Sequence, residues 1–198
     1  MDELLDRFLP EYGRRVVHGI TVAAPPERVW AALQAVTLDE LPLPRALLAL
    51  RTLPSRLRGK GPDLLDRSVP LAELFRRDGR WVVLAEEPGR ALVLGRVARF
   101  WRPVPQGAGA VRDAGGFLAF EEPGYAKAVI SHRVVAQGTG SRLVTETRIR
   151  GTDVRAARLF AGYWFLIRPG VGLIRRSALA AVGRRCGDNG FRVRGGMA

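Results

Sequence analysis

Apolar and polar residues alternate through the middle of the chain, which is the two-residue period of β-strands. An earlier stretch, Arg15–Ala24, shows the same alternation with β-branched residues. Turn residues at Glu87–Arg90 and at Gly138-Thr139-Gly140 separate neighbouring segments, as in hairpins. The pattern therefore predicts a strand at Arg15–Ala24 and paired strands at Arg80–Glu87, Ala91–Arg99, Tyr125–Ala136 and Ser141–Gly151.

After Gly151 the apolar residues recur every three or four positions, which is the period of an amphipathic helix. Thr152 or Asp153 can cap the first turn and Gly187 can close the last one, so the helix should end at Cys186. A straight helix of this size would be about 50 Å long, and we predict a kink or break around Pro169-Gly170. The expected apolar face consists of Phe160, Tyr163, Trp164, Ile167, Val171, Ile174, Ala178 and Val182.

Shorter helices are predicted elsewhere from proline positions and apolar spacing. Pro25-Pro26-Glu27 opens one helix, because proline fits a first turn and an acidic residue there suits the helix dipole. Asp2–Leu9 and Val69–Arg77 predict two more, and the proline-broken stretch Leu41–Arg58 predicts short helical pieces that form a lid. Without repeats or linkers, residues 1–186 are expected to form one domain, followed by a frayed tail at 187–198.

The composition limits which classes of protein remain possible. A chain of 198 residues can bury a sizeable core, and it carries a formal net charge of +13. Of the 32 basic residues, all except Lys60 and Lys127 are arginines. This bias favours a solvated basic surface over a functional surface that binds phosphate, membranes or acidic partners. One cysteine, Cys186, excludes an internal disulfide and a thiolate metal site. We expect a cytoplasmic protein without a signal peptide or a transmembrane segment.

Motifs for cofactor chemistry are missing from the sequence. The glycines at 107–116 lack the strand, helix and Lys-Ser/Thr spacing of a phosphate loop, and the two histidines lie on separate strands. No metal and no cofactor is therefore predicted. If the Gly138-Thr139-Gly140 loop is symmetric, His132 faces Glu146 across the hairpin. Such a pair is either an acid–base dyad or a surface cross-strand contact.

The order of these elements resembles the START-like superfamily, also called SRPBCC, which includes the polyketide cyclase/dehydrase group. Val16–Ala24 followed by Pro25-Pro26-Glu27-Arg28-Val29-Trp30 is similar to that family's strand and "P-x-x-V-W/F" helix, and Val144–Ile149 is similar to its last strand. The resemblance covers about residues 15 to 186. It implies an α+β helix-grip fold, in which a curved antiparallel sheet wraps around the long C-terminal helix, with short lid helices.

In this family the space between sheet and helix holds an apolar molecule, so the resemblance implies binding of a lipid, polyketide or similar ligand. One alternative is a polyketide cyclase/dehydrase-like enzyme that uses His132, Glu146 and Tyr125 as acid–base groups. Another is a basic module that binds nucleic acid or an anionic membrane, although we expect no nucleic-acid partner. The predicted ligand-binding residues are Trp81, Trp101, Phe117, Phe120, Tyr125, Phe160, Tyr163, Trp164 and Ile167.

Overall fold

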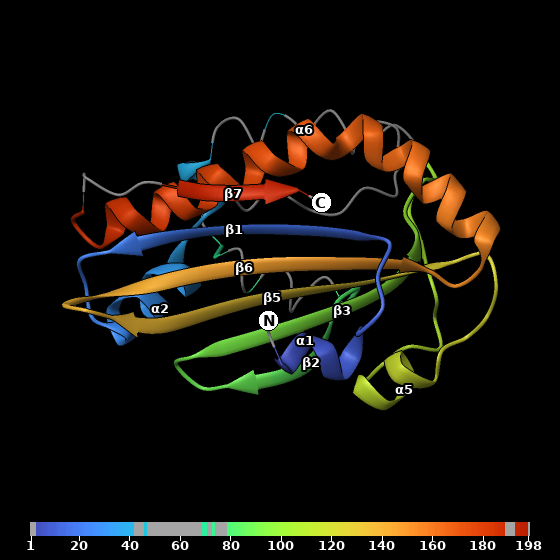
Figure 1. Cartoon of the computed structure of the whole chain (residues 1–198), viewed down its shortest axis with the longest axis horizontal. Coiled ribbons are helices and arrows are strands. Elements are labelled where there is room, and N and C mark those ends of the chain that lie inside the picture. Colours follow the sequence, from blue (N-terminus) through green and yellow to red (C-terminus); the bar gives the residue numbers. More distant parts are fainter. Residues whose placement is uncertain are drawn as a thin grey trace.

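The computed structural model describes residues 3–41, 46, 69–70, 73, 79–188 and 193–197. This part of the chain contains a seven-stranded antiparallel sheet, with strands in the order β2-β3-β5-β6-β1-β7 and β4 paired to β3 (Figure 1). The strands are β1 (Arg14–Val22), β2 (Val82–Glu87), β3 (Ala91–Arg99), β4 (Gln106–Gly107), β5 (Ala126–Gln137), β6 (Gly140–Gly151) and β7 (Val193–Met197). The helices are α1 (Glu3–Phe8), α2 (Pro26–Ala35), the 3₁₀ turn η1 (Leu38–Glu40), α5 (Ala114–Ala119) and α6 (Val154–Arg185).

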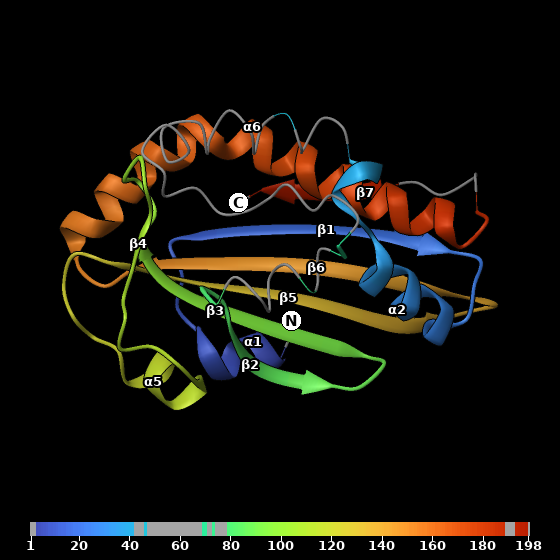
Figure 2. The ribbon, with the colours of Figure 1, turned by 180° about the vertical axis from the view of Figure 1, so that it is seen from behind.

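The fold is α+β, with the long helix α6 lying along one side of the curved sheet, and this confirms the predicted helix-grip arrangement (Figure 1). We call the side of the sheet that α6 covers the α6 face, and the other side the outer face. Figure 2 shows α6 on one side of the strands and α1 with α5 on the other. Side chains alternate between the two faces along each strand, so each face has its own core.

Helix α6 begins where the sequence predicts. The Asp153 side chain caps it by accepting a hydrogen bond from the Ala156 amide at 2.8 Å, and Gly187 has the positive φ of 76° that ends such helices. The predicted kink or break around Pro169-Gly170 is not a break, because the helix continues through both residues. Figure 1 shows instead that α6 is arched over the sheet. Proline removes one helical hydrogen bond, which a bend can accommodate.

The β5–β6 hairpin is tighter than predicted. Gln137 pairs with Gly140, so the loop has two residues, Gly138 and Thr139, and Gly138 has a φ of 58°. A left-handed glycine suits a two-residue turn, whereas a three-residue loop was expected. The register therefore differs by one residue, and His132 lies opposite Thr145. The predicted pairing of His132 with Glu146 is wrong, because a one-residue shift places them on opposite faces.

Two further elements differ from expectation. The predicted frayed tail contains β7, which pairs antiparallel with β1 from Val16↔Met197 to Ile20↔Val193. No helix was predicted at Ala114–Ala119, where the structure has α5, which Asp113 caps by accepting a hydrogen bond from the Gly116 amide at 2.7 Å. The helices predicted at Leu41–Arg58 and Val69–Arg77 fall mostly outside the described residues.

Candidate ligand site between the sheet and helix α6

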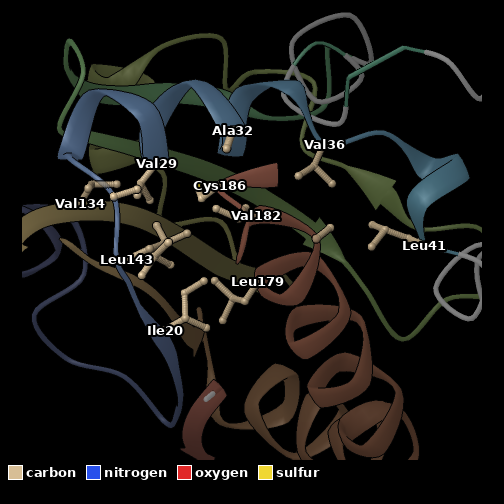
Figure 3. Close-up of a cluster of buried hydrophobic side chains, with 13 residues drawn as sticks. Ile20, Val29, Ala32, Val36, Leu41, Val134, Leu143, Leu179, Val182 and Cys186 are labelled. Atoms are coloured by element: carbon tan, nitrogen blue, oxygen red, sulfur yellow. The ribbon is translucent and has the colours of Figure 1, made fainter. Parts of the chain in front are cut away.

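The α6 face carries two apolar clusters, one under each half of the helix. The aliphatic cluster joins Leu179 and Val182 of α6 to Ile20, Val134 and Leu143 of the sheet, and α2 closes it from the side (Figure 3). The aromatic cluster lies under the other half of α6 and contains Val16, Ala126, Ala128, Ile149, Phe160 and Trp164, with Phe100, Trp101, Tyr163, Ile167 and Val171 packed against it.

Polar side chains occupy the α6 face between these clusters. The register places His18 of β1, Thr145 of β6 and His132 of β5 in one row across three neighbouring strands. Arg175 reaches down from α6 and donates hydrogen bonds from its two terminal nitrogens to the hydroxyl oxygens of Thr145 and Thr147. We call these five residues the polar band.

Within the polar band, Arg175 and His132 lie between α6 and the sheet, and both still have side-chain surface that is accessible to solvent. Both are half-buried, as is Ile130 one row away on β5. Burial nevertheless lowers the pKa of His132 to about 3, with a smaller contribution from the Arg175 charge, and it lowers the pKa of Arg175 to about 10. His132 is therefore a neutral imidazole at pH 7, while Arg175 keeps its charge.

Two members of the polar band have unsatisfied donors or acceptors. The His18 side chain is 0% exposed, and neither of its ring nitrogens has a hydrogen-bond partner. Burial, together with the charges of Arg175 and Arg176, lowers the His18 pKa, so this imidazole is also neutral at pH 7. The buried Nε of Arg175 has no partner either. Among the described residues, no carboxylate forms an ion pair with Arg175.

The structure brings six of the nine predicted ligand-binding residues to the α6 face. Trp101, Phe160, Tyr163, Trp164 and Ile167 all belong to the aromatic cluster or pack against it. Trp81 is connected to this cluster through Arg96 of β3. The Arg96 guanidinium carbon lies 5.9 Å from the centre of the Trp81 ring and 5.6 Å from that of Phe100. Phe100 in turn makes an edge-to-face contact with Phe160, with ring centres 6.1 Å apart.

The other three predicted residues lie elsewhere. Phe117 and Phe120 belong to a separate core with α1, α5 and the outer-face residues of β3 and β5, and Tyr125 packs against it. The rings of Phe120 and Tyr125 are 5.2 Å apart. This grouping corrects the expectation that they line the space beneath α6, because α5 carries Phe117 onto the opposite side of the sheet.

Glu146 takes part in an ion-pair network on the outer face. Its carboxylate accepts hydrogen bonds at 2.8 Å from Nε of both Arg15 and Arg148, and Arg148 also contacts Asp6 of α1 at 2.5 Å. Burial disfavours the Glu146 carboxylate, but the hydrogen bonds from the two arginines outweigh burial and lower its pKa. Glu146 is therefore a structural anion and lies across the sheet from His132.

The polar band was missed from the sequence, although one signal was present. Arg175 follows Val171 by four residues and precedes Leu179 by four, so it occupies the apolar face of the predicted helix. An arginine at such a position either enters the space beneath the helix or bends away from it, and here Arg175 is half-buried against the two threonines. The threonines gave no comparable signal, because threonine is common in strands.

A groove of about 530 Å³ lies away from the polar band, at the tip of β1 and the β5–β6 hairpin. Thr21, Arg142, Asp188 and Arg194 contribute to its lining. These polar side chains suit water better than an apolar ligand. Within the described residues, no group of three or more His, Cys, Asp or Glu side chains is arranged to hold a metal ion. In the same part of the chain, no helix has both the length and the apolar character needed to span a membrane.

Comparisons with known proteins add little to this description. No family model matches the chain, and no curated protein matches it. Among solved structures, CalU16 from Micromonospora echinospora is similar at 15% identity and a TM-score of 0.28, covering 87% of this chain and 83% of that one. TTHA0849 from Thermus thermophilus is similar at 14% identity and a TM-score of 0.28, covering 87% and 96%. Neither likeness is close enough to indicate a function.

Proposed function

We propose that the protein binds a mostly apolar small molecule between the aromatic cluster and the polar band. The observation that carries this proposal is the partial exposure of Ile130, His132 and Arg175. β5 is paired on both sides, by β3 and β6, and α6 covers the face to which these side chains belong. Accessible surface at such a central position is best explained by a space beneath the helix that a ligand can fill.

The walls of this space suit an apolar ligand. Trp101, Tyr163, Ile167 and Val171 are half-buried and pack against the aromatic cluster, so each has apolar surface left to cover. Every 100 Å² of apolar surface removed from water contributes about 2.5 kcal/mol. The polar band at one end supplies a few hydrogen-bonding groups that would orient the ligand.

The same geometry favours binding over acid–base catalysis. His132 and Glu146 point to opposite faces, and Glu146 is already held by two arginines. A histidine with a pKa of about 3 is also a weak base at pH 7. Binding without a chemical step is therefore the simpler function for this site.

A matched pair of substitutions on α6 tests the proposal. Ile167 packs against the aromatic cluster, whereas its neighbour Leu166 is 79% exposed. Ile167→Trp should fill the space and weaken binding of the neutral fluorescent probe N-phenylnaphthylamine by about tenfold or more, which corresponds to about 1.4 kcal/mol. Leu166→Trp should leave binding unchanged. Equal effects of the two substitutions, in variants with unchanged circular dichroism, would contradict a site beneath α6.

A second candidate function rests on the outward surface of α6. Phe165 and Leu166 are 80% and 79% exposed, and Leu159 is 45% exposed. The exposed arginines Arg158 and Arg168 flank them on the same helix. Protruding apolar side chains bordered by arginines are typical of helices that lie on anionic lipid surfaces. We propose that α6 contacts such a surface, and the apolar side chains favour lipid over nucleic acid as the partner.

Co-sedimentation with vesicles tests the second candidate. The protein should bind vesicles that contain phosphatidylserine more strongly than vesicles of phosphatidylcholine alone, and Phe165→Ser with Leu166→Ser should abolish this binding. Val135→Ser is a suitable control, since Val135 is an exposed apolar residue of β5, 48% exposed, that does not lie on α6. Equal binding to both vesicles, or equal loss in the control, would contradict contact through α6.

A further inference from the structure

We propose that the ligand of this site carries a carboxylate, and that Arg175 of the polar band binds it. The inference rests on the proposed function, because it concerns the same space beneath α6. It goes further by assigning a chemical class to the ligand, an apolar molecule with one anionic end.

The first argument is the unmatched charge of Arg175. A cation that is partly removed from water is costly unless an anion or a full set of hydrogen bonds compensates it. Arg175 has five N–H donors, yet its hydrogen bonds go to two neutral hydroxyl groups, and its buried Nε has no partner. A carboxylate that reached Nε would satisfy this donor and neutralise the charge in one contact.

The second argument is the chemistry of the surrounding wall. Side chains that β1, β3, β5 and β6 direct to the α6 face include arginine, histidine, serine and threonine, but no aspartate or glutamate in the strand residues that are described. Thr145 and Thr147 accept hydrogen bonds from Arg175, so each hydroxyl can still donate its own hydrogen. The neutral imidazoles of His18 and His132 each carry one N–H. The described strand residues of this wall are thus rich in donors and offer no competing anion.

The third argument comes from His18, an independent observation at the same place. Its side chain is fully buried, neither ring nitrogen has a partner, and it lies beside Thr145 in the register. Buried polar groups without partners are rare in folded proteins and call for an explanation. An anionic ligand head, with any water it holds, would supply acceptors to this corner of the site.

The experiment compares two ligands of equal chain length, dodecanoate and dodecanol, by displacement of N-phenylnaphthylamine from the whole chain. The wild-type protein should bind dodecanoate more tightly by roughly 10- to 100-fold, the range of a charge-assisted hydrogen bond in a buried site. Arg175→Gln should reduce this ratio to about one while keeping the affinity for dodecanol. Arg176→Gln is the matched control, because Arg176 is the exposed neighbour and the net charge changes by the same amount.

Each outcome bears on one proposal. Equal binding of the acid and the alcohol by the wild-type protein would overturn the carboxylate inference and leave the apolar site intact. Equal loss of preference in Arg175→Gln and Arg176→Gln would also overturn it, since the preference would then belong to the overall positive charge. If the wild-type protein binds neither compound nor the probe, the proposed function itself fails. The wild-type comparison needs no substitution, so it decides even if Arg175→Gln does not fold.

Discussion

The two histidines on the α6 face should make this protein less stable in mild acid. His132 has an ordinary pKa of 6.5 in the unfolded chain and about 3 in the folded one. Below pH 6.5 His132 therefore takes up a proton in the unfolded state but stays neutral in the folded state. The free energy of unfolding consequently falls as the pH drops through 6.5, and the loss continues toward pH 3. The full contribution of neutral His132 is present above pH 6.5.

The size of this effect follows from the two pKa values. Between about pH 7.5 and about pH 5.5, one histidine that stays neutral in the folded protein costs about 1.4 kcal/mol of stability. His18 has a pKa lowered in the same direction, so it adds up to the same amount. For a chain of this length, 1 kcal/mol corresponds to about 2–4 °C in the melting temperature.

Substituting His132 isolates its contribution to the pH dependence of the free energy of unfolding. The sequence contains two histidines, so His132→Gln leaves His18 as the one remaining imidazole. We expect the stability lost between these two pH values to be smaller by about 1.4 kcal/mol in His132→Gln, measured by urea unfolding followed with circular dichroism. If the variant loses as much stability as the wild-type protein, His132 takes up its proton in the folded state, and its placement deep beneath α6 is wrong.

Two further predictions concern stability and have matched controls. Gly195→Val should lower the free energy of unfolding by about 1–3 kcal/mol, because a Cβ at this position in β7 would lie 2.7 Å from Cγ of His18. Gly196→Val should be tolerated, since nothing lies within 4 Å of a Cβ there. Equal melting temperatures of the two variants would argue against β7 packing on His18. Arg148→Met should lower the free energy of unfolding by about 3 kcal/mol, because it leaves buried Glu146 with one arginine. The Arg150 side chain is 48% exposed, so Arg150→Met should lower it by less than about 1 kcal/mol. Equal urea midpoints for these two variants would contradict the ion-pair network.

Much of the fold could be predicted from local patterns. The bounds of β3 agree with the sequence, and those of β5 and β6 differ by one residue, because alternation and turn residues are local signals. The cap at Asp153 is equally local. β7 could not be predicted in this way, since Val193–Met197 contains two glycines and has no alternating apolar face. It is a strand because its backbone pairs with that of β1.

The site was harder to predict than the fold, because it depends on register and on which face each segment covers. Because the loop has two residues instead of three, His132 pairs with Thr145 and not with Glu146. The proposed acid–base dyad therefore loses its carboxylate. Phe117 shows the second difficulty, since its short helix gives no sign of the face it packs on. Arg175 was visible in the helical spacing, but its partners Thr145 and Thr147 came from a register that the sequence did not settle.

The two faces of β6 provide an internal comparison for the carboxylate proposal. Arg148 is a buried arginine on the outer face, and there the chain supplies Glu146 and Asp6 as its anions. Arg175 of α6 contacts the opposite face of the same strand, and there the chain supplies hydroxyl groups and neutral imidazoles. On the outer face the fold therefore pairs its buried arginine Arg148 with carboxylates. The different treatment of Arg175 is therefore better explained by a partner that arrives from outside than by a role in holding the sheet together.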